Sequence, residues 1–289
     1  MNAFYTPLRY PGGKGKFAGY VKELFVVNKL LDGHYVEPFA GGAGIAIELL
    51  LQDYIEHAHI NDLDRSIYSF WYCVLMETDA FCDLIECTPV SIEEWFRQRS
   101  IQRSVENIGL LELGFSTFFL NRCNRSGIIK GGVIGGKNQD GKWKLDARFN
   151  KPDLLQRIRQ IARFKSRISL YNSDAEDFLR VVVPKTPQNT LVYLDPPYYV
   201  KGKGLYTNHF VHDDHVRLAE QVAAGVAGMR WVVSYDNVPQ IGQLYSEFRS
   251  MVYQLSYSAA ERYQGSEIMI FSNELLIPPI PIGIPVYAA

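Results

Sequence analysis

The chain has 289 residues, of which 47% are hydrophobic and 21% charged, and its formal net charge is −1. These values are typical of an ordinary soluble globular protein with one large domain or two modest ones. The N-terminus lacks a basic region followed by an apolar core, and the longest apolar run, near Ile45 to Leu51, contains Glu48. We therefore predict no signal peptide and no membrane span.

Two α/β stretches are predicted, and the first contains a βαβ unit. Its expected elements are a helix over 17–31, a strand over 35–38, a helix from the glycines at 41–44 to residue 51, a strand over 57–61 and a helix over 65–76. The second stretch follows the same pattern. Its expected elements are a strand over 168–171, a helix opened by a capping box at 173–176, a strand over 191–194, a helix over 212–226, a strand over 231–234 and an antiparallel pair over 252–256 and 268–271.

The segment between these stretches has a different character. Helical patterns cover 92–104 and 113–120, and a glycine-rich basic segment follows them. Asp140-Gly141, before Lys142-Trp143-Lys144-Leu145, predicts a β-hairpin. We therefore predict an α/β catalytic domain over 1–69 and 165–289 and a mainly helical insertion over 70–164.

The glycines of Gly41-Gly42-Ala43-Gly44 lie between a strand and a helix, where they let the backbone approach a cofactor closely. Asp62 ends the next strand, about twenty residues later, where an acid accepts hydrogen bonds from ribose hydroxyls. A tight turn alone would also use such glycines. Together with Asp62 they favour a nucleoside-containing cofactor.

Asp195-Pro196-Pro197-Tyr198 directly follows an apolar strand. Because the prolines lack N–H donors, the chain must leave the sheet here, and it holds a carboxylate and an aromatic ring at the strand's C-terminal end. Ligands of open α/β sheets bind at that end. Two acceptors and a flat ring suit a planar guest with an exocyclic amino group, although a rigid turn is the competing interpretation.

Basic residues are concentrated in one block. Residues 121–167 contain thirteen Lys and Arg and three Asp and Glu, a local balance of +10 against −11 for the remainder. A basic block in an acidic body is typical of a surface that contacts nucleic-acid phosphates. A solvated basic surface is the alternative.

Two further patterns exclude other chemistries. Near the N-terminus, Gly15-Lys16 is followed by Phe17 instead of Ser or Thr, which disfavours a nucleotide triphosphatase. The four cysteines show neither paired C-x-x-C spacing nor accompanying histidines. They indicate reduced thiols of a cytoplasmic protein without a metal site.

Taken in order, these motifs resemble the Dam-like, class-α family of DNA adenine-N6 methyltransferases over residues 7 to about 277. The resemblance is carried by Tyr10-Pro11-Gly12-Gly13-Lys14, Glu37-Pro38-Phe39-Ala40-Gly41-Gly42, Asn61-Asp62, Leu120-Asn121-Arg122 and Asp195-Pro196-Pro197-Tyr198. Two positions depart from the family pattern: Ala43 replaces the last glycine of the loop, and Tyr10 replaces a frequent Trp.

The resemblance implies a Rossmann-like sheet ending in a reversed hairpin, with S-adenosyl-L-methionine as cofactor. Tyr10 and Phe39 are expected to line its methionyl and adenine ends, and Lys14 to reach its carboxylate. Asp62 would hold the ribose hydroxyls and Asp174 the adenine amino group. The remaining expected cofactor contacts are Glu37, Gly41 and Asp195.

The same resemblance assigns the catalytic roles. The target adenine must be flipped out of double-stranded DNA, at a cost of roughly a few kcal/mol. Tyr198 would stack on the base, which contributes about 1–3 kcal/mol. Asp195 and the Pro196 carbonyl would accept the two N6–H bonds and direct the nitrogen at the methyl group.

The insertion is expected to bind DNA, with a monomeric enzyme and a cognate restriction endonuclease as a candidate partner. The expected DNA contacts are Asn121, Arg122, Asn124, Arg125, Lys130, Lys137, Lys142 and Lys144. Alternatives are a cytosine-N4 methyltransferase, an RNA adenine-N6 methyltransferase and a catalytically silent DNA-binding protein on the same scaffold. Relatives of the first type more often carry Ser in place of Asp195.

Overall fold

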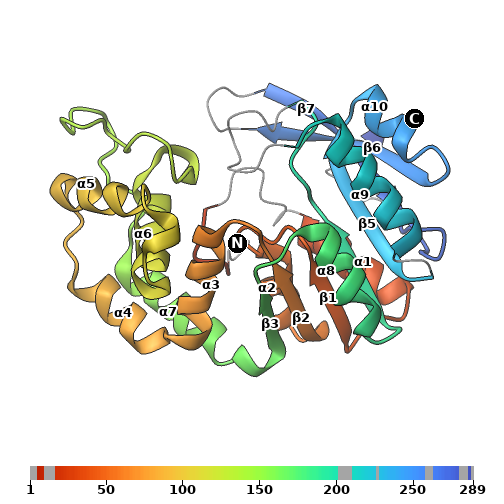
Figure 1. Ribbon diagram of the computed structural model, residues 1–289, viewed down its shortest axis with the longest axis horizontal. Coiled ribbons are helices and arrows are strands. Elements are labelled where there is room, and N and C mark those ends of the chain that lie inside the picture. The colour runs from red at the N-terminus through yellow and green to blue at the C-terminus, as the bar shows by residue number, and fades with distance from the viewer. Residues whose placement is uncertain are drawn as a thin grey trace.

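The computed structural model describes residues 5–9, 17–200, 210–225, 228–257, 263–279 and 286–287. Its centre is one mixed sheet with helices on both faces, and a helical lobe lies at one side (Figure 1). The strands are β1 (Gly33–Glu37), β2 (Ile55–Asn61), β3 (Ile168–Tyr171), β4 (Thr190–Leu194), β5 (Arg230–Asp236), β6 (Arg249–Tyr257), β7 (Tyr263–Phe271) and β8 (Val286–Tyr287). The predicted α/β class is confirmed.

The strand order is β3-β2-β1-β4-β5-β7-β6-β8. The first five strands are parallel, whereas β7 lies antiparallel to both β5 and β6. The expected reversed hairpin is therefore present as β6 and β7. Strand order reverses direction between β1 and β4, and ligands of doubly wound sheets bind at such a switch point.

Two apolar cores cover the two faces of the sheet. Tyr35 and Ala58 belong to the core formed with α1 and α2, whereas Val36 and Val192 belong to the core formed with α8 and α9. This alternation follows from the two-residue period of a strand. The helices are α1 (Ala18–Val27), α2 (Gly44–Leu51), α3 (Arg65–Met76), α4 (Thr78–Cys87), α5 (Ile92–Ile101), α6 (Leu110–Cys123), α7 (Lys151–Ala162), α8 (Ala175–Val181), α9 (His212–Gly225) and α10 (Pro239–Leu244).

Side-chain caps fix where several helices begin. Asp64, Ser91 and Asn150 accept hydrogen bonds from the first-turn N–H groups of α3, α5 and α7. The cap of α8 differs from the expected capping box, in which Ser173 is the N-cap. Asp174 is the N-cap instead, because its carboxylate accepts from the N–H groups of Glu176 and Asp177.

The helical lobe, α4 to α7 with part of α3, lies at the left in Figure 1. The expected boundary at residue 70 falls inside α3, which packs on α6 and α7. The same helix is tied to the sheet, because Trp71 Nε1 donates to the Gly41 carbonyl at 2.9 Å. The apolar core therefore runs without a break from the sheet into the lobe.

Two details of the lobe differ from the sequence-based expectation. The hairpin predicted at Asp140-Gly141 is absent, and the fully described stretch 134–149 forms successive turns. The antiparallel pairing nearby is a single bridge between Asn124 and Val133. The patterns also did not identify α4, α7 and α10 as separate helices. None of the helices in the described ranges is long and apolar enough to cross a bilayer.

Candidate active site

The C-terminal ends of the parallel strands bring together the residues of the site. Glu37 ends β1, Asn61 ends β2, Asp195 follows β4 and Asp236 ends β5. They come from four strands around the switch point, which the sheet order places side by side. The sequence motifs thus meet at the edge where such sheets bind ligands.

Asn61 holds three strand ends in register. Its Nδ2 donates to the Pro38 carbonyl at 2.9 Å and to the Ser173 carbonyl at 3.0 Å. Its Oδ1 accepts from the Ser173 N–H at 2.9 Å. Because Asn61 is completely buried, these bonds form away from water and fix the rim of the site.

The glycine loop after β1 is oriented by Asp62. The Gly41 N–H donates to Asp62 Oδ2 at 2.8 Å, and the Asp64 N–H donates to Oδ1 at 2.9 Å. Burial, with the nearby charge of Asp64, raises the pKa of Asp62 to about 7. Gly41 has a φ of +47°, and Ala43 adopts the left-handed region at +44°. Ala43 thus retains the backbone conformation that a glycine would favour there.

Glu37 supplies a second buried carboxyl beside this loop. Tyr35 Oη donates to its Oε1 at 3.0 Å, whereas Oε2 has no hydrogen-bond partner. Burial raises the pKa of Glu37 to about 8, against the opposing effect of hydrogen bonds from Tyr35 and the Ala46 N–H. An unsatisfied polar atom at this position suits a ligand with a hydrogen-bonding group.

Asp195 is half-buried at the end of β4, and its carboxylate is oriented by the neighbouring strand. Ser234 Oγ, on β5, donates to Asp195 Oδ1 at 3.0 Å. The turn that follows is held by Asp236, whose two carboxylate oxygens accept from the N–H groups of Tyr199 and Val200. The backbone that leaves the sheet at the two prolines is therefore hydrogen-bonded to the end of β5 at Tyr199 and Val200.

Tyr198 is held in place by buried hydrogen bonds. Its hydroxyl donates to Glu267 Oε1 at 2.5 Å, and Tyr253 Oη donates to Glu267 Oε2 at 2.5 Å. Glu267 is completely buried, and Tyr198 is only 4% exposed. A base can therefore stack on this ring only if DNA binding uncovers it.

The remaining expected cofactor contacts occupy different environments. Phe39 is half-buried and meets Phe210 edge-to-face at 6.0 Å between ring centroids. Asp174 is exposed at the end of β3, and one of its oxygens caps α8. Tyr10 and Lys14 lie outside the described residues.

Arg9, immediately before Tyr10 in the chain, is clamped by the helical lobe. Asn121 Oδ1 accepts from the Arg9 N–H at 2.8 Å, and Asn121 Nδ2 donates to the Arg9 carbonyl at 2.7 Å. Thr6 Oγ1 donates to the Gly42 carbonyl at 2.6 Å. The segment 6–9 therefore connects the glycine loop to the lobe.

The structure places Asn121 and Asn124, both expected to contact DNA, inside the helical lobe. Both are buried, and their side chains are engaged inside the lobe. Asn124 Oδ1 accepts from Trp95 Nε1 at 2.7 Å, and its Nδ2 donates to the carbonyls of Ile128 and Ile129. In this arrangement both amides hold the lobe together, and neither is accessible to a base edge.

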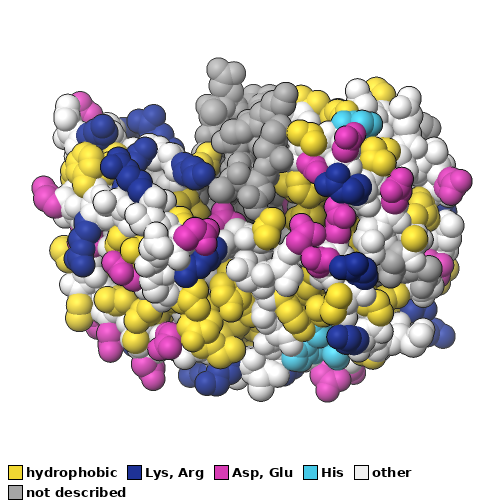
Figure 2. All heavy atoms as spheres, in the orientation of Figure 1, with side chains coloured by type: hydrophobic (Ala, Val, Ile, Leu, Met, Phe, Trp, Pro, Cys, Tyr) yellow, Lys and Arg dark blue, Asp and Glu magenta, His cyan; other side chains and the backbone are white. Residues whose placement is uncertain are grey.

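The expected cationic contacts divide into two groups. Arg122 donates to the Arg148 and Pro7 carbonyls, and burial lowers its pKa to about 10. The other five are exposed, and Figure 2 shows Lys and Arg side chains grouped on the upper part of the lobe. These five are Arg125, Lys130, Lys137, Lys142 and Lys144.

Motif analysis missed Ser234, Asp236 and Glu267. The first and second lie on the strand next to β4, so only the sheet order reveals that they reach the Asp195 turn. Glu267 directly precedes the apolar residues Ile268 to Phe271 of β7. An acid at the start of such a run was a signal available from sequence, because a buried carboxylate requires partners.

The chain is similar to known proteins over most of its length. The family model for D12 class N6 adenine-specific DNA methyltransferases matches residues 10–259. The chain is 22% identical over 265 residues to the Type II methyltransferase M.MjaIII of Methanocaldococcus jannaschii, across 83% of this chain and 88% of that protein.

Two solved structures share similarity over most of their lengths. One is the rRNA methyltransferase aviRa from Streptomyces viridochromogenes, with a TM-score of 0.38 and 10% identity over 91% of this chain and 85% of that one. The other is a Legionella pneumophila protein, with a TM-score of 0.31 and 11% identity over 89% and 86% of the two chains. Both scores are low, so the fold is assigned from the sheet topology. Since the family model spans most of the sequence, the chain belongs to the D12 class of N6 adenine-specific DNA methyltransferases.

Proposed function

We propose that this enzyme positions a flipped adenine of duplex DNA against Asp195 and the Pro196 carbonyl, for methylation of N6. The observation that carries the proposal is the orientation of Asp195 by Ser234 at the end of β4. The backbone turn after Asp195 is also fixed, by hydrogen bonds to Asp236. A carboxylate held in this way is preorganised for a charge that develops during reaction.

The cofactor we propose is S-adenosylmethionine, whose sulfonium supplies an electrophilic methyl group. The acceptors around the glycine loop fit its donors. Asp62 is oriented by two backbone N–H groups and suits ribose hydroxyls, and Glu37 Oε2 is a buried atom without a partner. Phe39 and Asp174 remain proposed contacts of its adenine, as Tyr10 and Lys14 do of its methionyl end.

The protein's own groups account for the chemistry at the target nitrogen. Asp195 and the Pro196 carbonyl accept the two N6–H bonds, which turns the nitrogen lone pair out of conjugation with the ring. As the bond from that nitrogen to the methyl group forms, the bond from the methyl group to the sulfonium sulfur would break. The carboxylate of Asp195 stabilises the positive charge that develops on the nitrogen, which then loses one proton to solvent. We propose that Tyr198 supports the base after its ring is uncovered.

We propose that the helical lobe is the part that recognises DNA, through its exposed cations and Arg122. The burial of Asn121 and Asn124 supports the exposed cations over these two amides as the contacts with DNA. Arg125 suits a base edge or a phosphate, and the lysines suit phosphates. A monomeric enzyme with a cognate restriction endonuclease stays part of the proposal.

The test is methylation of duplex DNA by the purified protein with methyl-labelled S-adenosylmethionine, followed by nucleoside analysis. The expected product is N6-methyladenine, at levels that fall to background in Asp195→Ala. Labelled N4-methylcytosine, or transfer to RNA but not to DNA, would overturn the substrate assignment. Cofactor and DNA binding without any transfer would indicate the silent scaffold.

A further inference from the structure

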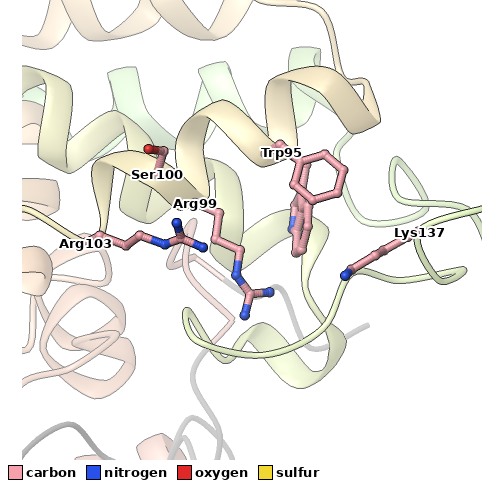
Figure 3. A pocket seen from close by; sticks show the side chains of 6 residues that line it. Trp95, Arg99, Ser100, Arg103 and Lys137 are labelled. Atoms are coloured by element: carbon pink, nitrogen blue, oxygen red, sulfur yellow. The ribbon is translucent and has the colours of Figure 1, made fainter.

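A cavity lies between α5 and the loop that follows α6. Its volume is about 330 Å³, and its lining is Trp95, Phe96, Arg99, Ser100, Arg103 and Lys137. Figure 3 shows Arg99 and Arg103 extending from the region of α5, while Lys137 reaches toward them from the facing loop. Three cationic ends therefore face one space.

The cations of this cavity have no acidic partner among the residues that the structure describes. Within the described part of the chain, none of Arg99, Arg103 and Lys137 forms an ion pair with Asp or Glu. Arg97, on the same helix, differs because it pairs with Glu94 at 3.6 Å. The negative end of a helix dipole supplies only about half an elementary charge. Three like charges thus leave a positive field that favours an anion.

Two aromatic rings line the cavity beside its cations. Arg99 lies over the Trp95 ring at 5.0 Å, and Lys137 lies over the Phe96 ring at 5.9 Å. Trp95 is buried, and its Nε1 donates to Asn124, which is itself bonded to the next loop. Phe96 is 49% exposed. Cations interleaved with an accessible ring are typical of surfaces that bind nucleic acids.

The loop opposite α5 connects the cavity to the rest of the site. Arg99 Nη1 donates to the Gly131 carbonyl at 3.4 Å. Residues of the same loop region contact Arg9, because Arg9 Nη1 donates to the Asn124 carbonyl at 3.1 Å. An anion in the cavity would thus be held by a wall that is continuous with the segment before Tyr10.

We propose that this cavity binds a backbone phosphate of the DNA duplex that carries the target adenine, through Arg99, Arg103 and Lys137. The proposal rests on the proposed function and adds two cations, Arg99 and Arg103, that precede the basic block in sequence. Arginine and lysine provide the charge-assisted donors that phosphate oxygens accept.

The experiment compares Arg99→Gln and Arg103→Gln with Arg97→Gln, which removes the same charge from α5 at a position paired with Glu94. Affinity for a duplex of about 25 base pairs, a length within the range of specific sites, is measured between 50 and 200 mM salt. Each cavity variant is expected to lose one phosphate contact. The log–log slope should then fall by about 0.9, and affinity at 0.1 M salt roughly eightfold.

Several outcomes would decide the matter. The proposal would be overturned if Arg99→Gln and Arg103→Gln had the same DNA affinity and salt slope as Arg97→Gln. It would also be overturned by competition of inorganic phosphate for the cavity without any effect of the variants on DNA binding. Unchanged S-adenosylmethionine affinity and melting temperature in the variants would support a contact with DNA alone. A parent enzyme that neither binds nor methylates DNA would instead overturn the proposed function.

Discussion

The carboxylate of Asp236 lies 2.8 Å from the backbone nitrogen of Tyr199, so the end of β5 fixes the turn formed by Asp195-Pro196-Pro197-Tyr198 after β4. The second oxygen accepts from Val200 at 3.0 Å. Pro196 and Pro197 fix two φ angles but offer no N–H donors, so the backbone after them is hydrogen-bonded to the neighbouring strand through Tyr199 and Val200. We therefore expect Asp236 to act as a positioning residue for Asp195.

Asp236→Asn is expected to lower kcat by roughly 10- to 100-fold, because a misplacement near 1 Å has that effect on an aligned reaction. The amide retains one acceptor but presents an N–H to the other backbone N–H. S-adenosylmethionine affinity should stay near that of the parent. Steady-state kinetics and calorimetry test this, with the exposed Asp213→Asn as control. Parent-like kcat in Asp236→Asn would contradict the assignment.

Asp195→Ala should remove methyl transfer while cofactor affinity stays within about tenfold of the parent, because the carboxylate orients the target amine. Ser234→Ala should reduce kcat less, since it removes one hydrogen bond that orients Asp195. Single-turnover rates with both variants give the comparison. Equal losses in the two variants would show that Ser234 does more than orient its neighbour.

The affinity for S-adenosylmethionine should rise about tenfold from pH 6 to pH 8. The pKa of Asp62 is raised to about 7, so its carboxylate forms over this range, and the charged form accepts hydroxyl hydrogen bonds better. Asp62→Asn should bind more weakly at pH 8 and show a flatter dependence. Calorimetry at three pH values measures both effects, and an equally steep rise in Asp62→Asn would exclude Asp62 as the titrating group.

Asn121→Ala should destabilise the protein by about 2–4 kcal/mol, because the side chain satisfies buried groups of Arg9 and Gly127. Cofactor affinity should fall with it, since Arg9 directly precedes Tyr10. Arg125→Ala is the matched comparison from the same motif, and its exposed side chain should leave the melting temperature unchanged. Denaturant unfolding decides this, and equal stabilities of the two variants would refute the role of Asn121.

A histidine cluster should make folding sensitive to acid. His34 Nδ1 lies 2.9 Å from His59 Nε2, and His57 packs beside both rings. Burial, and then the neighbouring histidines, lowers the pKa of His59 to about 3. The unfolded chain binds a proton between the ordinary histidine pKa and that value, so stability falls as pH drops through this window.

Between pH 7 and pH 4, the unfolding free energy of His59→Gln should fall by roughly 3 kcal/mol less than that of the parent. Glu56 and Arg167 lie near the cluster and act in opposite directions on His57, so they offset each other in part. Urea unfolding at the two pH values measures the difference. If the parent and the variant lose equal stability between the two pH values, His59 is not the acid-sensitive group.

Local sequence signals identified the parts of the site that depend on local structure. Glycines, a strand-ending acid and a double proline mark turns wherever they occur, which explains why Asp62 and Asp195 were located correctly at strand ends and Gly41 in the turn between β1 and α2. Asn121 could not be interpreted in this way. Its partner Arg9 is 112 residues away, and an exposed and a buried Asn look alike in a basic segment. The same holds for Asp236, whose role depends on the pairing of β4 with β5.

The strands of the sheet come from two stretches of sequence separated by the helical lobe, and this order affects how the chain folds. Asn61 bonds to Ser173 across 112 residues, so β2 gains its outer neighbour only after the whole helical lobe has been synthesised. Until then β1 and β2 present unpaired edges, which invite association with other chains. Such non-local pairing slows folding. We therefore expect the lobe to fold first, closure of the sheet to limit the rate, and the yield of active enzyme to depend on temperature and chaperones during expression.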